Sequence, residues 1–355
     1  MLSSIHIECS TIIYMKPKFV ISTGVGWSAT TPLWYTLQVA NKFIHAGLIK
    51  ESQYLYNVSD TKENILRKKI AQRRLYKNHN IPTLKNPLNG FKFTNNKFNH
   101  FFKNRIPEVK RDMYLTQEEI DNYITAPYTF VRYINYYKRL WETLQENNCP
   151  YEGVADFSNA NGWIPEESLP KTIEKLSEYF DVKALIIVRD PIRRLWSEVG
   201  GFWDLKYKYD KQGNLKAEES LPNIELYKNL LFEYARGYNQ SQYFSIIDKW
   251  EKVCPFHVII MEQLWEGDEQ EREKQRLSDF LDYDIKNTHE NVYCPDRGTN
   301  APKHLGLKDQ WSSDKYSLSD ELYNQVLPLM PIYQQWVDRY GSLPLYWGKP
   351  YPYEV

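Results

Sequence analysis

The chain lacks several features that would place it in a broad functional class. Its four cysteines show no metal-ligand spacing, so we expect reduced cysteines and no metal site; they are Cys9, Cys149, Cys254 and Cys294. No apolar run reaches the ~18 residues of a membrane span, so we expect no membrane anchor. Basic and acidic residues are equal in number, 45 of each, which argues against a broad electrostatic field for nucleic acid or a membrane surface.

We also expect no targeting signal at the start of the sequence. Residues 1–8 have no basic cluster and include Glu8, so we expect no signal peptide. We therefore expect the protein to be cytoplasmic. Met15 directly precedes the first expected strand, and we interpret residues 1–15 as a tail. Residues 16–355 are numerous enough to bury one large α/β core.

An apolar strand followed by an arginine-rich helix is the most informative stretch. The apolar residues 185–188 predict a strand that stops at Arg189. Pro191 suits the first turn of a new helix, because its φ is fixed and it has no N–H to lose. Ser197 lies eight positions after Arg189, on that helix. A guanidinium and a hydroxyl placed this way converge on one anion at the carboxyl edge of a sheet, where open α/β folds bind ligands. The alternative is a surface arginine that starts an amphipathic helix.

A second strand–loop–helix unit lies near the N-terminus. Residues 18–23 predict a strand, and glycines and hydroxyl residues follow it before an apolar helical stretch through Ala40. Backbone N–H groups in such a loop, together with the helix dipole, form a phosphate cradle. The candidate ligands are Gly26, Trp27, Ser28, Ala29, Thr30 and Thr31. A Walker A motif would need Gly and Lys where the chain has Ala29 and Thr30, so the loop is a poor match to that motif.

The two units together resemble the PAPS-dependent sulfotransferase family. Residues 189–191 and 195–197 (Arg-Asp-Pro and Leu-Trp-Ser) are similar to its 3′-phosphate-binding motif. Thr30, Thr31 and Leu33 match its 5′-phosphosulfate loop. The resemblance implies a three-layer α/β/α fold with a central, mostly parallel sheet, a P-loop-like phosphosulfate-binding loop and helical insertions. It also implies 3′-phosphoadenosine 5′-phosphosulfate (PAPS) as donor and adenosine 3′,5′-bisphosphate as product, with no metal.

The segment after the first helix resembles the "Lys-Glu, two residues, aromatic" strand of heparan-type sulfotransferases. In those enzymes the Glu takes the proton of the acceptor hydroxyl, so the resemblance implies Glu51 as general base. Lys50 is then an adjacent cation that contacts the sulfonate or the leaving phosphate. The alternative is a solvent-facing Lys-Glu pair at a strand end. His45 is the second candidate base, because cytosolic sulfotransferases use histidine.

Later segments follow the order of the same family. Residues 151–160 resemble the short strand that precedes the 3′-phosphate strand, and Glu262 follows a strand at residues 257–261. We interpret Glu262 as structural, tying down a loop. A basic loop then occupies the place where the family closes over adenosine bisphosphate, which implies three further ligands, Arg297, Gly298 and Lys303. A solvated loop is the alternative for these residues.

Residues 57–125 form an insertion relative to a minimal sulfotransferase. They are rich in Asn, Lys and Arg and include aromatic side chains, so we expect them either to wall the acceptor site or to form a solvated helical cap. The acceptor is a small molecule or a carbohydrate by resemblance. The sequence also leaves lipid and peptide tyrosine acceptors open, and it leaves the oligomeric state open.

The expected function is transfer of the sulfuryl group from PAPS to an acceptor hydroxyl, nearest to the carbohydrate branch of the family. Trp27 stands where the family has a basic residue, which favours one alternative: a non-catalytic module that binds PAPS, adenosine bisphosphate or a glycan. The other alternative is a P-loop small-molecule kinase. The missing Gly-Lys-Ser/Thr argues against it, because that motif supplies both the cation and the metal ligand.

Overall fold

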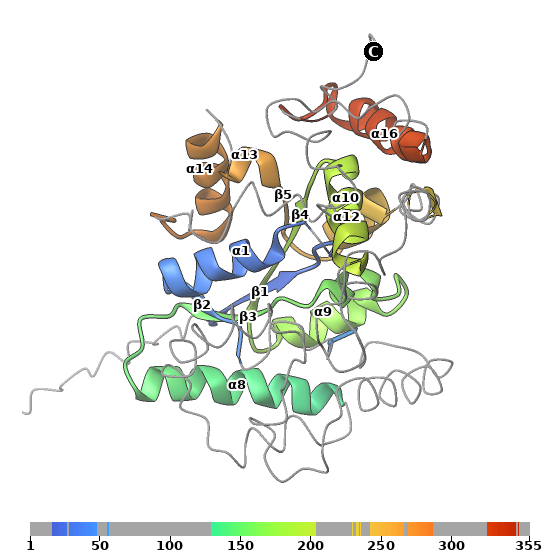
Figure 1. Ribbon diagram of the computed structural model, residues 1–355. Coiled ribbons are helices and arrows are strands. Elements are labelled where there is room, and N and C mark those ends of the chain that lie inside the picture. The colour runs from blue at the N-terminus through green and yellow to red at the C-terminus, as the bar shows by residue number, and fades with distance from the viewer. Residues whose placement is uncertain are drawn as a thin grey trace, which may run out of the picture.

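The protein is built on a parallel sheet flanked by helices (Figure 1). The computed structural model describes residues 16–26, 28–47, 55–56, 129–203, 229, 232–233, 235, 242–265, 269–286, 325–345 and 347. The expected tail and the insertion at 57–125 lie outside these residues. Within the described part of the chain, no helix is both long and apolar enough to cross a bilayer.

Five parallel strands form the sheet, in the order β2-β3-β1-β4-β5. The strands are β1 (Lys18–Ser22), β2 (Ile44–His45), β3 (Gly153–Asp156), β4 (Asp181–Val188) and β5 (Phe256–Ile260). The expectation of an α/β protein with a mostly parallel sheet is therefore confirmed. Because all strands run the same way, their carboxyl ends share one edge, with β1 in the centre between β3 and β4.

Two strand boundaries differ from those that the sequence predicts. β4 begins at Asp181, four residues before the apolar run, because polar side chains are tolerated at the rim of the sheet. β2 ends at His45, and residues 48–54 of the expected strand at residues 46–56 lie outside the described part of the chain. Gly47 follows with φ +72°, a left-handed conformation that stops the strand, and Leu55 and Tyr56 are helical.

Helices cover both faces of the sheet because successive strand residues point to opposite sides (Figure 1). In β1, Val20 belongs to one apolar cluster, whereas Phe19 and Ile21 belong to the other. The Val20 face is covered by α1 (Thr30–Tyr35) with the π-helix η1 (Thr36–Ala40), by α13 (Met261–Trp265) and by α14 (Gln270–Leu281). The Phe19 face is covered by α8 (Phe130–Glu146), α9 (Leu169–Ser177), α10 (Pro191–Trp203), α12 (Gln242–Glu251) and α16 (Met330–Tyr340).

Helix α8 was not anticipated from the sequence, although its pattern is amphipathic. Thr129 caps it by accepting a hydrogen bond from the backbone N–H of Arg132 at 3.3 Å. Tyr133, Tyr137 and Leu140 are spaced by three or four residues and are fully buried. The Tyr137 ring meets Phe19 of β1 edge-on, with 4.8 Å between the ring centroids. This helix therefore packs against the central strand β1 on the Phe19 face of the sheet.

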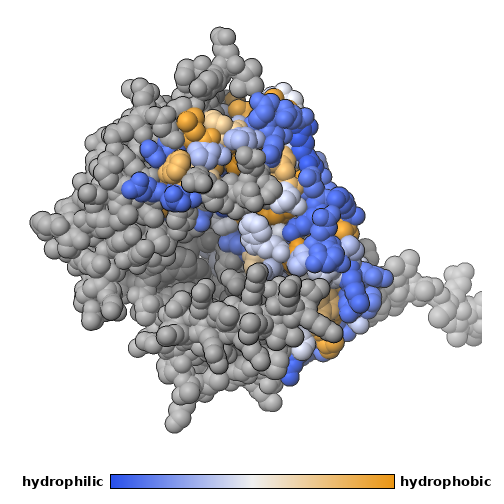
Figure 2. Space-filling view, turned by 90° about the vertical axis from the view of Figure 1, so that its right-hand side faces the viewer, coloured by the Kyte–Doolittle hydropathy of each residue, from blue (hydrophilic) through white to orange (hydrophobic). Residues whose placement is uncertain are grey.

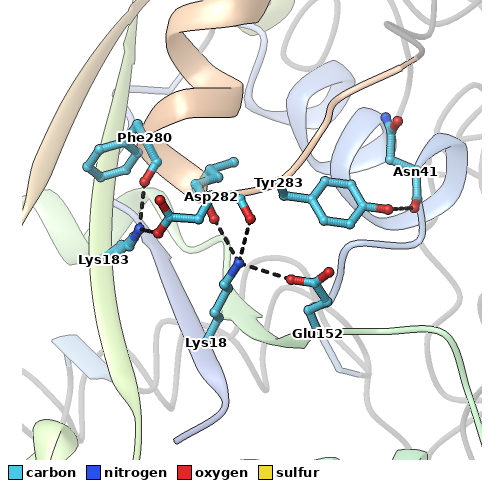
Figure 3. Close-up of polar contacts among 8 residues, drawn as sticks. Lys18, Asn41, Glu152, Lys183, Phe280, Asp282 and Tyr283 are labelled. Carbon is cyan, nitrogen blue, oxygen red and sulfur yellow. Dashed lines mark hydrogen bonds and ion pairs between the residues drawn. The ribbon is translucent and has the colours of Figure 1, made fainter. Parts of the chain in front are cut away.

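Two lysines fix the end of α14 to the amino edge of the sheet (Figure 3). Lys18 Nζ donates to the Glu152 carboxylate at 2.9 Å and to the carbonyls of Leu281 and Asp282 at 3.0 and 2.9 Å. Lys183 binds the Asp282 carboxylate. Terminal helix carbonyls lack intrahelical donors and carry partial negative charge, so both cations are well placed. The end of α14 therefore packs against the amino edge of the sheet, whereas the loops described below lie at the carboxyl edge.

We predict that Lys18→Met lowers the free energy of unfolding by about 1–3 kcal/mol, because it leaves partly buried carbonyls without their donor. Urea-induced unfolding measures the change. Lys252→Met is the control, since Lys252 pairs with Glu166 in solvent and its loss should leave the free energy of unfolding nearly unchanged. Equal effects of the two substitutions would contradict a structural role for the Lys18 clamp.

Candidate functional site: two loops at the carboxyl edge of the sheet

The loops after β1 and β4 meet at the carboxyl edge. From β1 the chain continues towards β2, and from β4 it continues towards β5 on the other side, so the two connections diverge here. Such a point of divergence is where open α/β sheets bind ligands. Thr23 fixes the start of the loop after β1 to strand β4, because its N–H and its hydroxyl both donate to the Leu185 carbonyl, at 2.8 and 3.1 Å.

The loop after β1 is tightly folded. A Cβ on Gly24 would lie 2.6 Å from Cγ2 of Thr30, so only glycine allows this close approach. Ala29 adopts the left-handed conformation, with φ +61°, immediately before α1 begins at Thr30. Ser28 is fully buried. A Cβ on Gly26, by contrast, would have Asn159 Nδ2 as its nearest neighbour at 3.7 Å, which is an ordinary van der Waals contact, so this position is less crowded than Gly24.

Arg194 of α10 connects the two loops directly. Its Nε donates to the Gly26 carbonyl at 2.9 Å. Its guanidinium also lies 5.7 Å from the centroid of the Tyr243 ring and 3.6 Å from the Glu198 carboxylate. Burial raises the pKa of Glu198, and the charge of Arg194 partly offsets this. The structure therefore brings the two predicted motifs into contact through an arginine that the sequence analysis placed on the helix without a role.

Tyr243 of α12 lies between the same two loops. Its hydroxyl donates to the Arg189 carbonyl at 2.8 Å, and burial raises its pKa. The Ser28 hydroxyl is close enough to influence the Tyr243 pKa, yet within the described residues it has no partner with hydrogen-bond distance and angle. Tyr243 thus fixes the backbone at Arg189, while Ser28 keeps unused hydrogen-bonding capacity.

Asp190 organises the start of α10. Its Oδ1 accepts from the N–H groups of Ile192 and Arg193 at 2.9 and 3.0 Å, which is the bonding of a helix N-cap. The Tyr333 hydroxyl also donates to this oxygen at 3.1 Å. The Asp190 N–H in turn donates to Oε1 of Glu262 at 3.0 Å. The interpretation of Glu262 as a structural residue that ties down a loop is therefore confirmed.

Glu262 is fully buried at the end of β5. Its Oε2 accepts the indole N–H of Trp347 at 2.9 Å, and its Oε1 lies 3.8 Å from the Arg193 guanidinium. Burial, with the nearby charge of Asp190, raises the pKa of Glu262 to about 7, while Arg193 and Arg189 oppose the shift. The positive charges of Arg189 and Arg193 therefore offset part of the negative charge of the carboxylates of Asp190 and Glu262 beside the loop after β4.

A third loop, after β3, is fixed against the first. Asp156 is buried, accepts from the Ser158 N–H at 3.0 Å and from the Tyr133 hydroxyl at 2.8 Å, and has a pKa raised by burial. Asn161 Nδ2 donates to the Ser22 carbonyl at 3.3 Å. These bonds hold the β3 loop beside the loop that contains Gly24 and Gly26.

The predicted site residues fall into three groups. Gly26, Ser28, Ala29 and Thr30 lie in the loop before α1 or at its start, and Arg189 follows β4 with its side chain partly exposed. Thr31 and Ser197 are described by their backbone alone, within α1 and α10. Six residues lie outside the described part of the chain: Trp27, Lys50, Glu51, Arg297, Gly298 and Lys303.

His45, the second candidate base, contributes to packing. It is fully buried, its Nδ1 accepts from the Gly47 N–H at 3.0 Å, and its ring lies edge-on to Tyr151. A ring with no exposed surface cannot reach a substrate in this conformation. Among the described residues, no group of three or more His, Cys, Asp or Glu side chains could hold a metal ion.

Sequence reasoning missed four residues of this edge: Tyr133, Tyr243, Tyr333 and Trp347. Each acts through the single polar atom of an otherwise apolar ring, and no local motif marks such a residue. Asp190 was more accessible to prediction, since an Asp before Pro at a helix start is a capping signal.

We predict that the stability of the wild-type protein depends on the titration of Glu262. Between pH 4.5 and 7 the folded state holds a proton on Glu262 that the unfolded state has lost, so the free energy of unfolding falls as the pH rises through this window. Glu262→Gln does not titrate. The difference in unfolding free energy, wild type minus variant, should therefore fall by roughly 3 kcal/mol from acid to neutral pH. Urea unfolding at several pH values measures it, and parallel pH profiles would contradict it.

Comparison with known proteins adds no relative. No family model matches the chain, and no curated protein matches its sequence. The interpretation of the site therefore depends on its own residues and geometry.

Proposed function

We propose that the protein is a PAPS-dependent sulfotransferase that transfers the sulfuryl group to an acceptor hydroxyl, with a carbohydrate as the favoured acceptor class. The observation that carries the proposal is the hydrogen bond from Arg194 to the Gly26 carbonyl. It joins the loop that resembles the 5′-phosphosulfate loop to the helix that carries the residues of the 3′-phosphate motif. A nucleotide with phosphates at both ends needs these two elements at one edge of the sheet.

The described residues fit an anionic nucleotide. Ser28 Oγ is buried near the Tyr243 hydroxyl and makes no hydrogen bond of good geometry among these residues, so it is placed to bond a ligand oxygen. Arg189 is partly exposed at the end of β4 and supplies positive charge there. A three-layer α/β/α fold with a P-loop-like phosphosulfate-binding loop is the finer fold that accompanies this proposal.

Each predicted residue has a defined task in the proposed reaction. When bound, PAPS supplies an activated sulfuryl group. Arg189 and Ser197 hold the 3′-phosphate, and the loop from Gly26 to Thr31 donates hydrogen bonds to the phosphosulfate end. Glu51 accepts the proton of the acceptor hydroxyl, and Lys50 offsets the negative charge that develops beside it. The basic loop at residues 297–303 adds positive charge around the nucleotide.

The second candidate function is a module of the same fold that binds the nucleotide or a glycan without catalysis. Trp27 favours it, because an indole has one N–H donor and no charge, whereas the family has a cation at this place. Both functions predict nucleotide binding, so they differ only in turnover. Titration with Mg²⁺-ATP separates both from a small-molecule kinase.

We predict that the protein binds adenosine 3′,5′-bisphosphate and that Arg189→Ala weakens this binding by about 10–100-fold, through loss of a charge-assisted contact with the 3′-phosphate. Isothermal titration calorimetry measures both affinities. Adenosine 5′-monophosphate is the ligand control, because it lacks the 3′-phosphate and should bind wild type and variant equally. Arg272→Ala, which removes an exposed arginine of α14, is the protein control. Absence of wild-type binding, or equal binding of the bisphosphate by Arg189→Ala, would refute the proposal.

We also predict that Trp27→Lys raises turnover by roughly a hundredfold, because a cation at this position stabilises the leaving phosphate. The assay follows transfer of label from radiolabelled PAPS to a pool of sugar and phenol acceptors. Adding Glu51→Gln to this variant should abolish transfer while leaving bisphosphate binding intact. Nucleotide binding without transfer in any variant would favour the non-catalytic module.

A further inference from the structure

The C-terminal part of the described chain reaches the loop after β4 with two polar groups. The Tyr333 hydroxyl of α16 donates to Asp190 Oδ1 at 3.1 Å and accepts from the Ile192 N–H at 3.3 Å. The indole N–H of Trp347 donates to Glu262 at 2.9 Å. Asp190 and Glu262 are the two buried carboxylates that fix the backbone beside Arg189. Both therefore receive a donor from more than 80 residues away in sequence, at separations of 143 and 85.

These two donors are held rigidly. Trp347 is 3% exposed, and its ring packs against Trp336 at 4.6 Å and against Tyr333 at 6.3 Å between centroids. Arg339, on the same helix, pairs with Asp248 and Glu251 of α12. Figure 2 shows this side of the molecule, where hydrophilic and hydrophobic residues are mixed on the surface of the described part. The ring contacts and the ion pairs make the segment a packed element of the fold.

The geometry points to Tyr333 and Trp347 as positioning residues for the anion-binding loop that contains Arg189. This inference rests on the proposed function, in which Arg189 holds the 3′-phosphate. Neither residue needs to touch the nucleotide. Each stabilises the charged form of a carboxylate, and each carboxylate accepts a backbone N–H of the turn that carries Arg189 into α10.

The physical reason is the cost of placing two carboxyl groups side by side in a buried place, where Oε1 of Glu262 accepts the N–H of Asp190. Burial and the nearby charge of Asp190 both raise the pKa of Glu262. Arg193 and Arg189 compensate for part of this repulsion. Removing a neutral donor such as the Tyr333 hydroxyl leaves Asp190 with fewer hydrogen bonds in a buried place, so its carboxylate turns away and the first turn of α10 opens. The backbone from which the Arg189 side chain extends then loses its fixed position.

Hydrogen exchange and calorimetry test the inference with Tyr333→Phe and Trp347→Phe. We expect faster exchange at the N–H groups of Asp190, Ile192 and Arg193, with little change elsewhere. We expect about tenfold weaker binding of adenosine 3′,5′-bisphosphate and unchanged binding of adenosine 5′-monophosphate. Equal loss of both ligands, or exchange that accelerates uniformly over the sheet, would show a purely structural role and overturn the inference.

Tyr283→Phe is the matched control. It removes the same hydroxyl from a tyrosine that donates to the Asn41 carbonyl at 2.6 Å, near the opposite edge of the sheet (Figure 3). It should leave exchange at residues 190–193 and the preference for the bisphosphate unchanged. If the wild type binds no bisphosphate, the proposed function fails and the exchange measurement decides the positioning role alone. Unchanged exchange at 190–193 in both C-terminal variants would then refute it.

Discussion

A single hydrogen bond, from Arg194 Nε to the Gly26 carbonyl, decides the arrangement of the carboxyl edge. The loop after β1 and the helix after β4 come from segments 168 residues apart. Thr23 fixes the base of the loop to β4, and Arg194 holds its outer part against α10. The small residues around Gly24 allow this approach, since a side chain there would collide with Thr30. Every interpretation of the edge as a binding site depends on this contact.

Buried carboxylates hold the other loops at this edge by accepting backbone hydrogen bonds. Asp156, Asp190 and Glu262 stand at or just after the ends of β3, β4 and β5, and each accepts a backbone N–H from a loop. Loops lack the regular pairing of strands, so side-chain acceptors must satisfy their backbone donors. The cost is electrostatic, and it appears as the raised pKa values of Asp156 and Glu262. The opposite edge uses the complementary chemistry, with Lys18 and Lys183 on helix carbonyls.

The sequence predicts those parts of the fold that depend on local chemistry. The buried β-branched run before Arg189 predicts the end of β4, and Pro191 does begin α10. The sequence does not predict the bounds of the short strand β2, because a strand of two residues is too short to show an alternation of apolar and polar side chains. The turn that follows depends on the left-handed φ of Gly47, which the sequence does not show.

In the candidate site, too, the sequence predicts the features that depend on local chemistry and not those that depend on tertiary contacts. The loop before Thr30 and the turn at Arg189 are readable from spacing and capping residues. Their contact through Arg194 is tertiary and has no local signal. Tyr333 and Trp347 were beyond prediction for the same reason, since an aromatic residue in an apolar pattern looks like core until its polar atom is seen to have a partner.

The bond between Trp347 and Glu262 has a consequence for biosynthesis. During translation, β4, α10 and β5 are made before residue 347, so Glu262 has no indole donor until Trp347 has followed. The hydrogen bonds of the carboxyl edge are therefore complete only after α16 and Trp347 have docked.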